Sequence, residues 1–274
     1  MKTIIRAAVA LFTLITAVPA FAQDGKKAEL LWLGQAAFRL TTPGGKVIMI
    51  DPWLTTNPRT PEKWKNLDEL GRVDLILVTH AHGDHFGDSP AIAKKHNAKI
   101  WSPAGLGSTI ATLGIVPEEL APRMNKSGTI KPWGDAGVKI TMVRAEHSSE
   151  LVWKNPDTGR NQVYVGGEAV GFIIELENGF KIYHMGDTGL FGDMKFIGEY
   201  YRPDVALIPI GGHYVMDPKD AAFAVNHWIK PKHAVPMHYG TNIFLKGTPE
   251  EFIKALGATP TKVHHIHPGD KLEF

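Results

Sequence analysis

Short apolar runs separated by turns characterise the first part of the chain. Residues 30–40 and 46–50 are mostly apolar and flank the turn Pro43-Gly44-Gly45, which predicts a β-hairpin. Residues 73–78 form an almost uninterrupted apolar run, which is typical of a buried strand. These segments predict a sheet near the start of the fold.

Helical segments alternate with these strands. Residues 62–70, 91–96 and 108–113 are predicted helices, and residues 99–101 a further strand. Ser89 followed by Pro90 is expected to be the N-cap and first residue of the second helix. Strands that alternate with helices indicate an α/β fold.

The second half of the chain repeats the pattern of the first. Residues 172–183 predict a hairpin with an Asn178-Gly179 turn, and residues 203–210 repeat the apolar run of residues 73–78. We therefore expect two similar halves, in which two β-sheets pack face to face with helices outside.

The start of the chain has the layout of a secretory signal peptide. Lys2 and Arg6 supply positive charge, residues 7–18 are apolar but short for a membrane span, and Ala20-Phe21-Ala22 offers an A-x-A cleavage site. We expect residues 1–22 to be removed on export to a bacterial periplasm or beyond, which would leave no stable membrane anchor. An uncleaved anchor or a buried N-terminal helix is the alternative.

Net charge and cysteine content limit the kinds of partner and metal ligand that we expect for this chain. Removal of residues 1–22 takes away Lys2, Arg6 and no acid, so the formal charge falls from +2 to zero. Bulk charge therefore does not favour nucleic acid or an anionic membrane as a partner. The chain has no cysteine, so it has neither a disulfide nor a thiolate metal ligand. A small-molecule substrate is the expected partner, and the oligomeric state stays open.

A histidine-rich segment directly follows the apolar run of residues 73–78. His80, His82, Asp84 and His85 lie within six residues, and imidazole and carboxylate are the usual ligands of zinc and related divalent ions. Gly83 and Gly87 disfavour a helix here, so we expect a loop in which Gly83 supplies the turn that brings His80 and His82 together. A solvated, histidine-rich turn is the alternative.

This segment resembles the His-x-His-x-Asp-His signature of the metallo-β-lactamase superfamily. The resemblance implies a four-layer αββα sandwich over residues 23–274, with a dinuclear metal site at one edge. It also implies three further ligands downstream, which His147, Asp187 and His238 match in order. By this analogy His80, His82 and His147 hold one ion, Asp84, His85 and His238 hold the other, and Asp187 bridges them.

Three later sequence segments indicate which branch of the superfamily the chain resembles. Residues 186–194, 209–214 and 236–241 look most like predicted metal-dependent hydrolases related to ascorbate-6-phosphate lactonase. The chain lacks the cysteine ligand of one β-lactamase subclass. It also has Asp187, which another subclass lacks. In His85-Phe86-Gly87-Asp88, Asp88 stands where the glyoxalase II tail His-x-Gly-Gly has its second glycine.

Other polar positions carry weaker signals. His213 falls where His80 fell in the first half and is a candidate catalytic residue beside Asp84, with a structural role as the alternative. His184 is expected in the core or behind the site, and His264, His265 and His267 on the surface or in packing rather than at a third metal. Residues 148–171 are expected to fold over the pocket and help select the substrate, unless they form a remote surface hairpin.

The expected reaction is hydrolysis. Two divalent ions, Zn²⁺ or alternatively Mn²⁺ or Fe²⁺, lower the pKa of a shared water, and the resulting hydroxide attacks a lactone, ester or phosphodiester. Asp84 orients that hydroxide and accepts a proton. The alternatives are a periplasmic β-lactamase and a non-catalytic metal-binding module on the same fold.

Overall fold

Two seven-stranded sheets form the centre of the protein, in a computed structural model that describes residues 26–274. The signal-peptide prediction for residues 1–22 lies outside the described residues. In the first sheet the strand order is β16 (Lys271–Glu273), β1 (Glu29–Gly34), β2 (Ala37–Thr41), β3 (Val47–Ile50), β4 (Leu75–Leu77), β5 (Lys99–Pro103) and β6 (Arg123–Met124).

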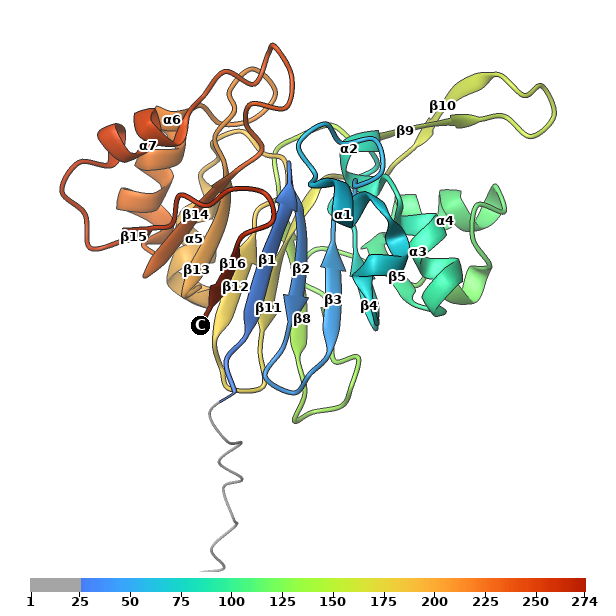
Figure 1. Cartoon of the computed structure of the whole chain (residues 1–274), viewed down its shortest axis with the longest axis horizontal. Coiled ribbons are helices and arrows are strands. Elements are labelled where there is room, and N and C mark those ends of the chain that lie inside the picture. Colours follow the sequence, from blue (N-terminus) through green and yellow to red (C-terminus); the bar gives the residue numbers. More distant parts are fainter. Residues whose placement is uncertain (1–25) are drawn as a thin grey trace, which may run out of the picture.

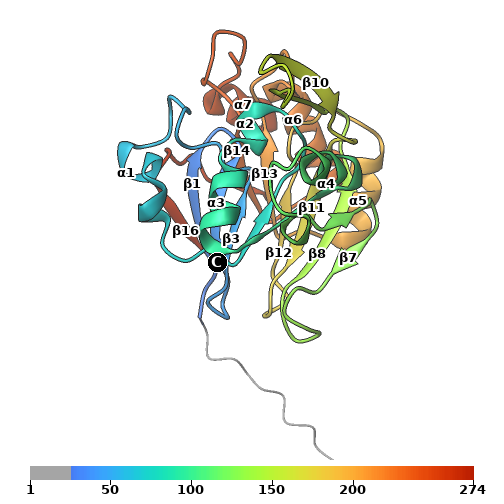
Figure 2. The same ribbon diagram turned by 90° about the vertical axis from the view of Figure 1, so that its right-hand side faces the viewer.

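The second sheet is built mainly from the second half of the chain and lies beside the first sheet in Figure 2. Its order is β15 (Lys262–Val263), β14 (His233–Met237), β13 (Val205–Pro209), β12 (Lys181–His184), β11 (Val170–Glu175), β8 (Lys139–Arg144) and β7 (Thr129–Ile130). A separate two-stranded ribbon, β9 (Glu150–Lys154) with β10 (Asn161–Val165), projects from the body at the upper right of Figure 1.

Helices cover the outer faces of both sheets. The first half contributes α1 (Glu62–Lys65), α2 (Gly83–Phe86), α3 (Ser89–His96) and α4 (Ala104–Thr112), with 3₁₀ turns at Leu67–Leu70 and Glu118–Leu120. The second half contributes α5 (Asp193–Tyr201), α6 (Pro218–Phe223), a π-helical stretch Ala224–Ile229 and α7 (Pro249–Leu256). Figure 1 shows α6 and α7 on one side of the sheets and α3 and α4 on the other.

Three apolar clusters hold the four layers together. The cluster between the sheets contains Phe38 and Phe172, both fully buried, and extends along the inner faces of both sheets. A second cluster packs the first sheet against α3 and α4, and a third packs the second sheet against α5 to α7. Burying this apolar surface is the main stabilising contribution to the fold. The predicted αββα sandwich is confirmed.

The internal repeat is also confirmed by strand directions. In each half an antiparallel pair precedes parallel strands: β2 pairs antiparallel with β3 and β3 parallel with β4, while β11 pairs antiparallel with β12 and β12 parallel with β13. The carboxyl ends of parallel neighbours meet at one edge of a sheet. The segments that follow β4, β12 and β14 therefore begin close together, at the top of Figure 1.

Three local predictions differ from the structure. Residues 30–40 form two strands, because a tight turn with Gln35 at φ +52° divides β1 from β2. Asp88, not Ser89, is the N-cap of α3, and α4 begins four residues before the predicted start at residue 108.

No helix within residues 26–274 is long and apolar enough to cross a membrane.

Candidate metal centre

Three histidines form the first group at the carboxyl edge of the sheets. His80 and His82 follow β4, and His147 follows β8. One nitrogen of each ring lies within 4.8 Å of the others, and His80 Nε2 is 3.0 Å from His82 Nδ1. Burial lowers the pKa of His80 well below its ordinary value, and that of His147 less strongly. Both rings are therefore neutral at pH 7 and offer lone pairs to a cation.

Two carboxylates and two histidines form the second group. Donor atoms of Asp84, His85, Asp187 and His238 all lie within 4.8 Å of one another. His85 Nε2 is 3.3 Å from His238 Nε2, which in turn is 3.4 Å from Asp84 Oδ2. Two acidic and two imidazole groups at this spacing match the ligand preferences of zinc, manganese or iron.

Positive charge is strongly stabilised in the second group. Burial alone would lower the pKa values of His85 and His238, but the carboxylates of Asp187 and Asp84 raise both, that of His238 to about 9. Burial alone would raise the pKa of Asp187, yet the two imidazoles hold it well below its ordinary value. This buried pocket therefore favours a cation, which without metal is supplied by protons.

Asp187 lies between the two groups. Its Oδ1 is 3.2 Å from His85 Nε2 and 3.0 Å from His238 Nε2, whereas Oδ2 faces His147 Nε2 at 3.6 Å. The carboxylate is buried, and Oδ1 makes no well-aligned hydrogen bond with either imidazole. A cation between the carboxylate and the imidazoles would account for donor atoms that lie this close without aligned hydrogen bonds. The residues present therefore fit a pair of metal ions with Asp187 between them.

Asp51 supports this arrangement from behind. It directly follows β3 and is fully buried. One oxygen accepts a hydrogen bond from the backbone N–H of Thr79 at 2.7 Å, and the other accepts from the Thr79 hydroxyl and lies 2.8 Å from His85 Nδ1. This contact fixes the His85 ring so that Nε2 faces Asp187, as outer partners of metal ligands commonly do.

Gln35 supports the opposite side of the pocket. Its amide nitrogen donates to Asp84 Oδ2 at 2.9 Å and lies 2.7 Å from His238 Nε2. Its amide oxygen accepts a hydrogen bond from the Thr241 hydroxyl. Gln35, in the turn between β1 and β2, thus orients Asp84, which follows β4, and His238, which follows β14.

The backbone at the site is strained in three places. Gln35, Asp51 and His238 have positive φ values of 52°, 45° and 56°. Such conformations cost non-glycine residues on the order of 1–3 kcal/mol each and persist only where the surroundings hold them. All three side chains belong to or contact the second donor group, so the backbone strain occurs where the polar groups of that donor group are positioned.

The histidine-rich segment contains a helical turn, which corrects the prediction of a loop. Gly83–Phe86 form α2, with His82 at the N-cap and Gly87 at the C-cap. Gly83 does not adopt a positive φ; that conformation occurs at Gly87, where φ is +32°. A Cβ at Gly87 would lie 2.7 Å from the backbone of Trp53, so only glycine fits there.

Five of the seven donor residues line a pocket of about 420 Å³. Its walls come from both halves of the chain and are formed by Gln35, Trp53, His82, Asp84, His147, Ser148, Asp187, Tyr214, His238, Thr241, Asn242 and Leu245. A pocket of this size accommodates a small organic molecule.

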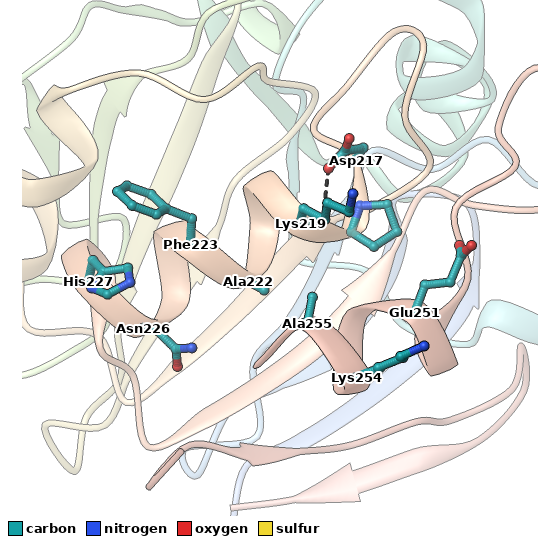
Figure 3. Close-up of a pocket in the computed structure, with 10 residues that line it drawn as sticks. Asp217, Lys219, Ala222, Phe223, Asn226, His227, Glu251, Lys254 and Ala255 are labelled. Atoms are coloured by element: carbon teal, nitrogen blue, oxygen red, sulfur yellow. Dashed lines mark hydrogen bonds between the residues drawn. The ribbon is translucent and has the colours of Figure 1, made fainter. Parts of the chain in front are cut away.

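A larger pocket of about 690 Å³ lies elsewhere, between α6 and α7. Figure 3 shows Ala222 and Ala255 in the groove between the two helices and the Asp217 carboxylate accepting from Lys219 N at 2.8 Å. That carboxylate caps α6, and none of the predicted site residues lines the groove. The smaller pocket is the candidate active site because the titratable groups converge there.

His213 lies at the rim of the candidate active site and does not line it. Its side chain is exposed, its φ is +60°, and its ring stacks on Phe244 with centroids 4.9 Å apart. The next residue, Tyr214, does line the pocket. Any role of His213 in catalysis would therefore be through substrate at the rim.

The remaining histidines lie away from the two groups. His184 is buried, and its Nε2 lies 2.9 Å from the Ala36 carbonyl, consistent with the expected core position. His264 Nε2 lies 2.9 Å from His233 Nδ1. Within residues 26–274, neither His264, His265 nor His267 belongs to a cluster of three donors that could hold a metal.

Residues 148–171 begin at the site and then leave it. Glu150 Oε2 lies 3.1 Å from His82 Nε2, on the side of the ring opposite the nitrogen that faces His80. Ser149 Oγ accepts a hydrogen bond from Ala81 N and donates to the Gly166 carbonyl. The base of residues 148–171 is therefore attached to the histidine-rich segment at Ala81, while the β9–β10 ribbon extends outward (Figure 1).

Comparison with protein families gives a match across most of this architecture. Residues 46–239 match the model of the beta-lactamase superfamily domain. That range contains all seven of the clustered histidine and aspartate residues.

Full-length relatives and solved structures agree with this match. A protein of Cupriavidus metallidurans described as a UPF0173 metal-dependent hydrolase is 61% identical over 90% of this chain and 86% of its own length. A protein from Rubrobacter xylanophilus with the same description is 45% identical over 89% of this chain and 96% of its own length. Among solved structures, Igni18, a metallo hydrolase of Ignicoccus hospitalis, is 35% identical in sequence; the match covers 90% of this chain and 98% of Igni18, with a TM-score of 0.76.

Proposed function

The chain belongs to the metallo-β-lactamase superfamily and is a metal-dependent hydrolase, and from this premise we propose that it uses two divalent ions to cleave a lactone, ester or phosphodiester bond. One observation carries the proposal: Asp187 presents one oxygen to each of two donor groups. Zn²⁺ suits these donors best, with Mn²⁺ or Fe²⁺ as alternatives.

The two ions would supply an activated water and electrostatic stabilisation of the developing oxyanion. The first would be held by His80, His82 and His147. The second would be held by Asp84, His85 and His238, with Asp187 shared between both.

Asp84 is placed to orient the attacking group. It lines the pocket, and its carboxylate is fixed by the Gln35 amide at 2.9 Å. Burial alone would raise the pKa of Asp84, but His85 and His238 hold it below its usual range. The group is therefore a carboxylate at neutral pH, which accepts a proton rather than donating one.

Export is a separate proposal that rests on the sequence of residues 1–22. The charged start, the short apolar stretch and the Ala20-Phe21-Ala22 site support cleavage before Gln23. Amino-terminal sequencing of protein recovered from the periplasm of an expressing bacterium tests it. A first residue of Gln23 is expected, and an intact Met1 in the cytoplasmic fraction would contradict export.

A substrate panel tests the hydrolytic proposal. The zinc- or manganese-loaded protein is incubated with p-nitrophenyl acetate, γ-decalactone, bis(p-nitrophenyl) phosphate and nitrocefin. Turnover of an ester, lactone or phosphodiester, abolished by a chelator, is expected. Turnover of nitrocefin alone would instead indicate a β-lactamase.

A further inference from the structure

The β9–β10 ribbon has one buried face and one exposed face. Side chains alternate along each strand, and directly paired residues of antiparallel strands share a face. Leu151 pairs with Tyr164, and Leu151 is only 2% exposed. Trp153 lies on the same face and packs edge-on against Phe86 of α2, with centroids 6.0 Å apart. This face anchors the ribbon to the first half of the protein.

The exposed face carries three valines, with Glu150 at its inner end and the Lys154–Asn161 pair at its outer end. Val152 pairs with Val163, and the two side chains are 57% and 62% exposed. Val165 pairs with Glu150 and is 71% exposed. Three exposed valines on one face of a two-stranded ribbon are unusual for a surface that contacts only water. We call this face, defined by Val152, Val163 and Val165, the valine face.

The valine face is continuous with the metal centre. Glu150 belongs to the same face as the three valines, and its carboxylate lies 3.1 Å from His82. Val165 is directly opposite Glu150, and the Val152–Val163 pair follows two residues farther out, roughly 7 Å along the ribbon. The apolar row thus begins at a candidate metal ligand and leads outward from it.

Further exposed apolar side chains border the pocket in two segments. Ile243 and Phe244 lie between β14 and α7, and Tyr214 lies before α6. Ile243 is 77% exposed, Phe244 47% and Tyr214 49%, and Tyr214 lines the pocket. In Figure 1 α7 and the ribbon lie on opposite sides of the upper edge. Apolar surface therefore flanks the pocket from both halves of the molecule.

The pocket wall contains neither lysine nor arginine. Its twelve lining residues include Asp84 and Asp187, and Glu150 lies beside His82. Phosphate and carboxylate groups of ligands are commonly bound by arginine or lysine. An anionic group of a substrate would therefore have to bind the metal ions themselves, and the rest of the lining suits a part of the substrate that carries no charge.

We propose that the valine face binds the apolar chain of an uncharged ester or lactone whose reactive carbonyl lies at the metal centre. This inference rests on the proposed hydrolytic function and specifies its substrate class. Full burial of a methylene corresponds to about a fourfold gain in binding. On an open ribbon we expect a smaller gain of about twofold per methylene.

An acyl-chain series tests the proposal. For the metal-loaded wild type, kcat/KM is measured with p-nitrophenyl acetate, butyrate and octanoate, and it should rise with chain length. The double variant Val152→Ser/Val163→Ser should lose most of this rise and retain its rate on the acetate. Phe196→Ser, at a 58% exposed position on α5, is the matched control and should keep the full rise.

A binding measurement separates this inference from the hydrolytic proposal. 2-Undecanone and 2-butanone are uncharged ketones without a leaving group, and their binding is followed by tryptophan fluorescence, because Trp53 lines the pocket and Trp153 lies in the ribbon. The longer ketone should bind more tightly, and the double valine variant should lose that preference. This result would support the valine face even if no ester were cleaved.

Two outcomes would overturn the inference. One is ester turnover with the same dependence on chain length in the double valine variant and in Phe196→Ser. The other is a marked preference for bis(p-nitrophenyl) phosphate over every uncharged ester, together with equal affinity for both ketones. Either result would leave the hydrolytic function intact.

Discussion

Asp51 Oδ2 lies 2.8 Å from Nδ1 of His85, and both side chains are fully buried. The contact determines which His85 nitrogen faces the other donor groups, since Nε2 is then directed to Asp187 at 3.2 Å. Asp51 does not approach the pocket itself, because it is absent from the lining residues. Its function is to position a candidate ligand.

Replacing Asp51 by Asn should therefore weaken metal binding without unfolding the protein. Loss of an outer partner of a metal ligand typically lowers affinity 10–100-fold. Metal content after dialysis against a competing chelator, with circular dichroism as the check on folding, measures the effect. Asp204→Asn is the control, because Asp204 caps the backbone N–H of Lys181 away from the site. Equal metal retention in both variants would contradict the assigned role.

Replacing His82 by Ala should abolish hydrolysis while leaving a folded protein. His82 is partly exposed at the N-cap of α2, so its removal leaves no large cavity in the core. The loss of kcat/KM should exceed the roughly 100-fold effect of an outer partner. His96→Ala, on α3, serves as the matched histidine control. Full activity in His82→Ala would remove the dinuclear mechanism.

The metal-free protein should lose stability as pH rises from about 6.5 to 9. The pKa of His238 is about 9 in the folded state, because Asp187 and Asp84 outweigh the effect of burial, against 6.5 ordinarily. A raised pKa means that the stabilising contribution is complete below pH 6.5 and disappears as pH passes 9. Thermal unfolding at several pH values, with and without metal, measures it.

Metal should reverse this pH dependence. A bound ion takes the place of the proton on His238, so metal binding releases protons and becomes tighter as pH rises toward 9. The melting temperature of the metal-loaded protein should therefore stay level or increase over the range in which that of the metal-free protein falls. Parallel curves for the two forms would show that His238 does not exchange a proton for metal.

Replacing His213 by Ala should change kinetics without changing metal content. The ring lies at the rim, stacked on Phe244 and 4.4 Å from the ring of Tyr214, which lines the pocket. Its removal should alter KM or the preference among esters rather than abolish turnover. Steady-state kinetics on the ester series, normalised to bound metal, tests this. Unchanged constants for every ester would assign His213 a structural role.

The local part of the candidate site could be predicted from the sequence because its residues are contiguous. His80, His82, Asp84 and His85 lie within one short segment after a strand, and their residue types alone suggest metal binding. His147 and His238 are isolated histidines, which only the order of the superfamily's motifs made significant. The structure places all of them together at one edge of the sheets.

Supporting residues were not predictable in the same way. Asp51 contacts a residue 34 positions away, Gln35 one that is 203 positions away, and Glu150 one that is 68 positions away. A single polar residue after a strand is common, so these positions carry no signal until the strands are arranged in space. The positive φ of Gln35 likewise depends on the tight turn between β1 and β2.

The helical turn α2 is not predictable from the sequence for a different reason. Glycine disfavours the interior of a helix, so Gly83 and Gly87 argue against a helix in this segment. In the structure Gly83 is the first residue of a single turn and Gly87 is its C-cap, where glycine is tolerated or preferred. The turn is stabilised by its surroundings rather than by helical propensity, which is usual for so short a helix.

Metal stoichiometry is the most direct test of the central claim that Asp187 joins two metal sites. Zinc and manganese are measured by mass spectrometry in the purified protein and in Asp187→Ala, with Asp204→Ala as the control. We predict close to two ions per chain in the wild type and in the control, and at most one in Asp187→Ala. A single ion per chain in all three proteins would contradict the dinuclear site.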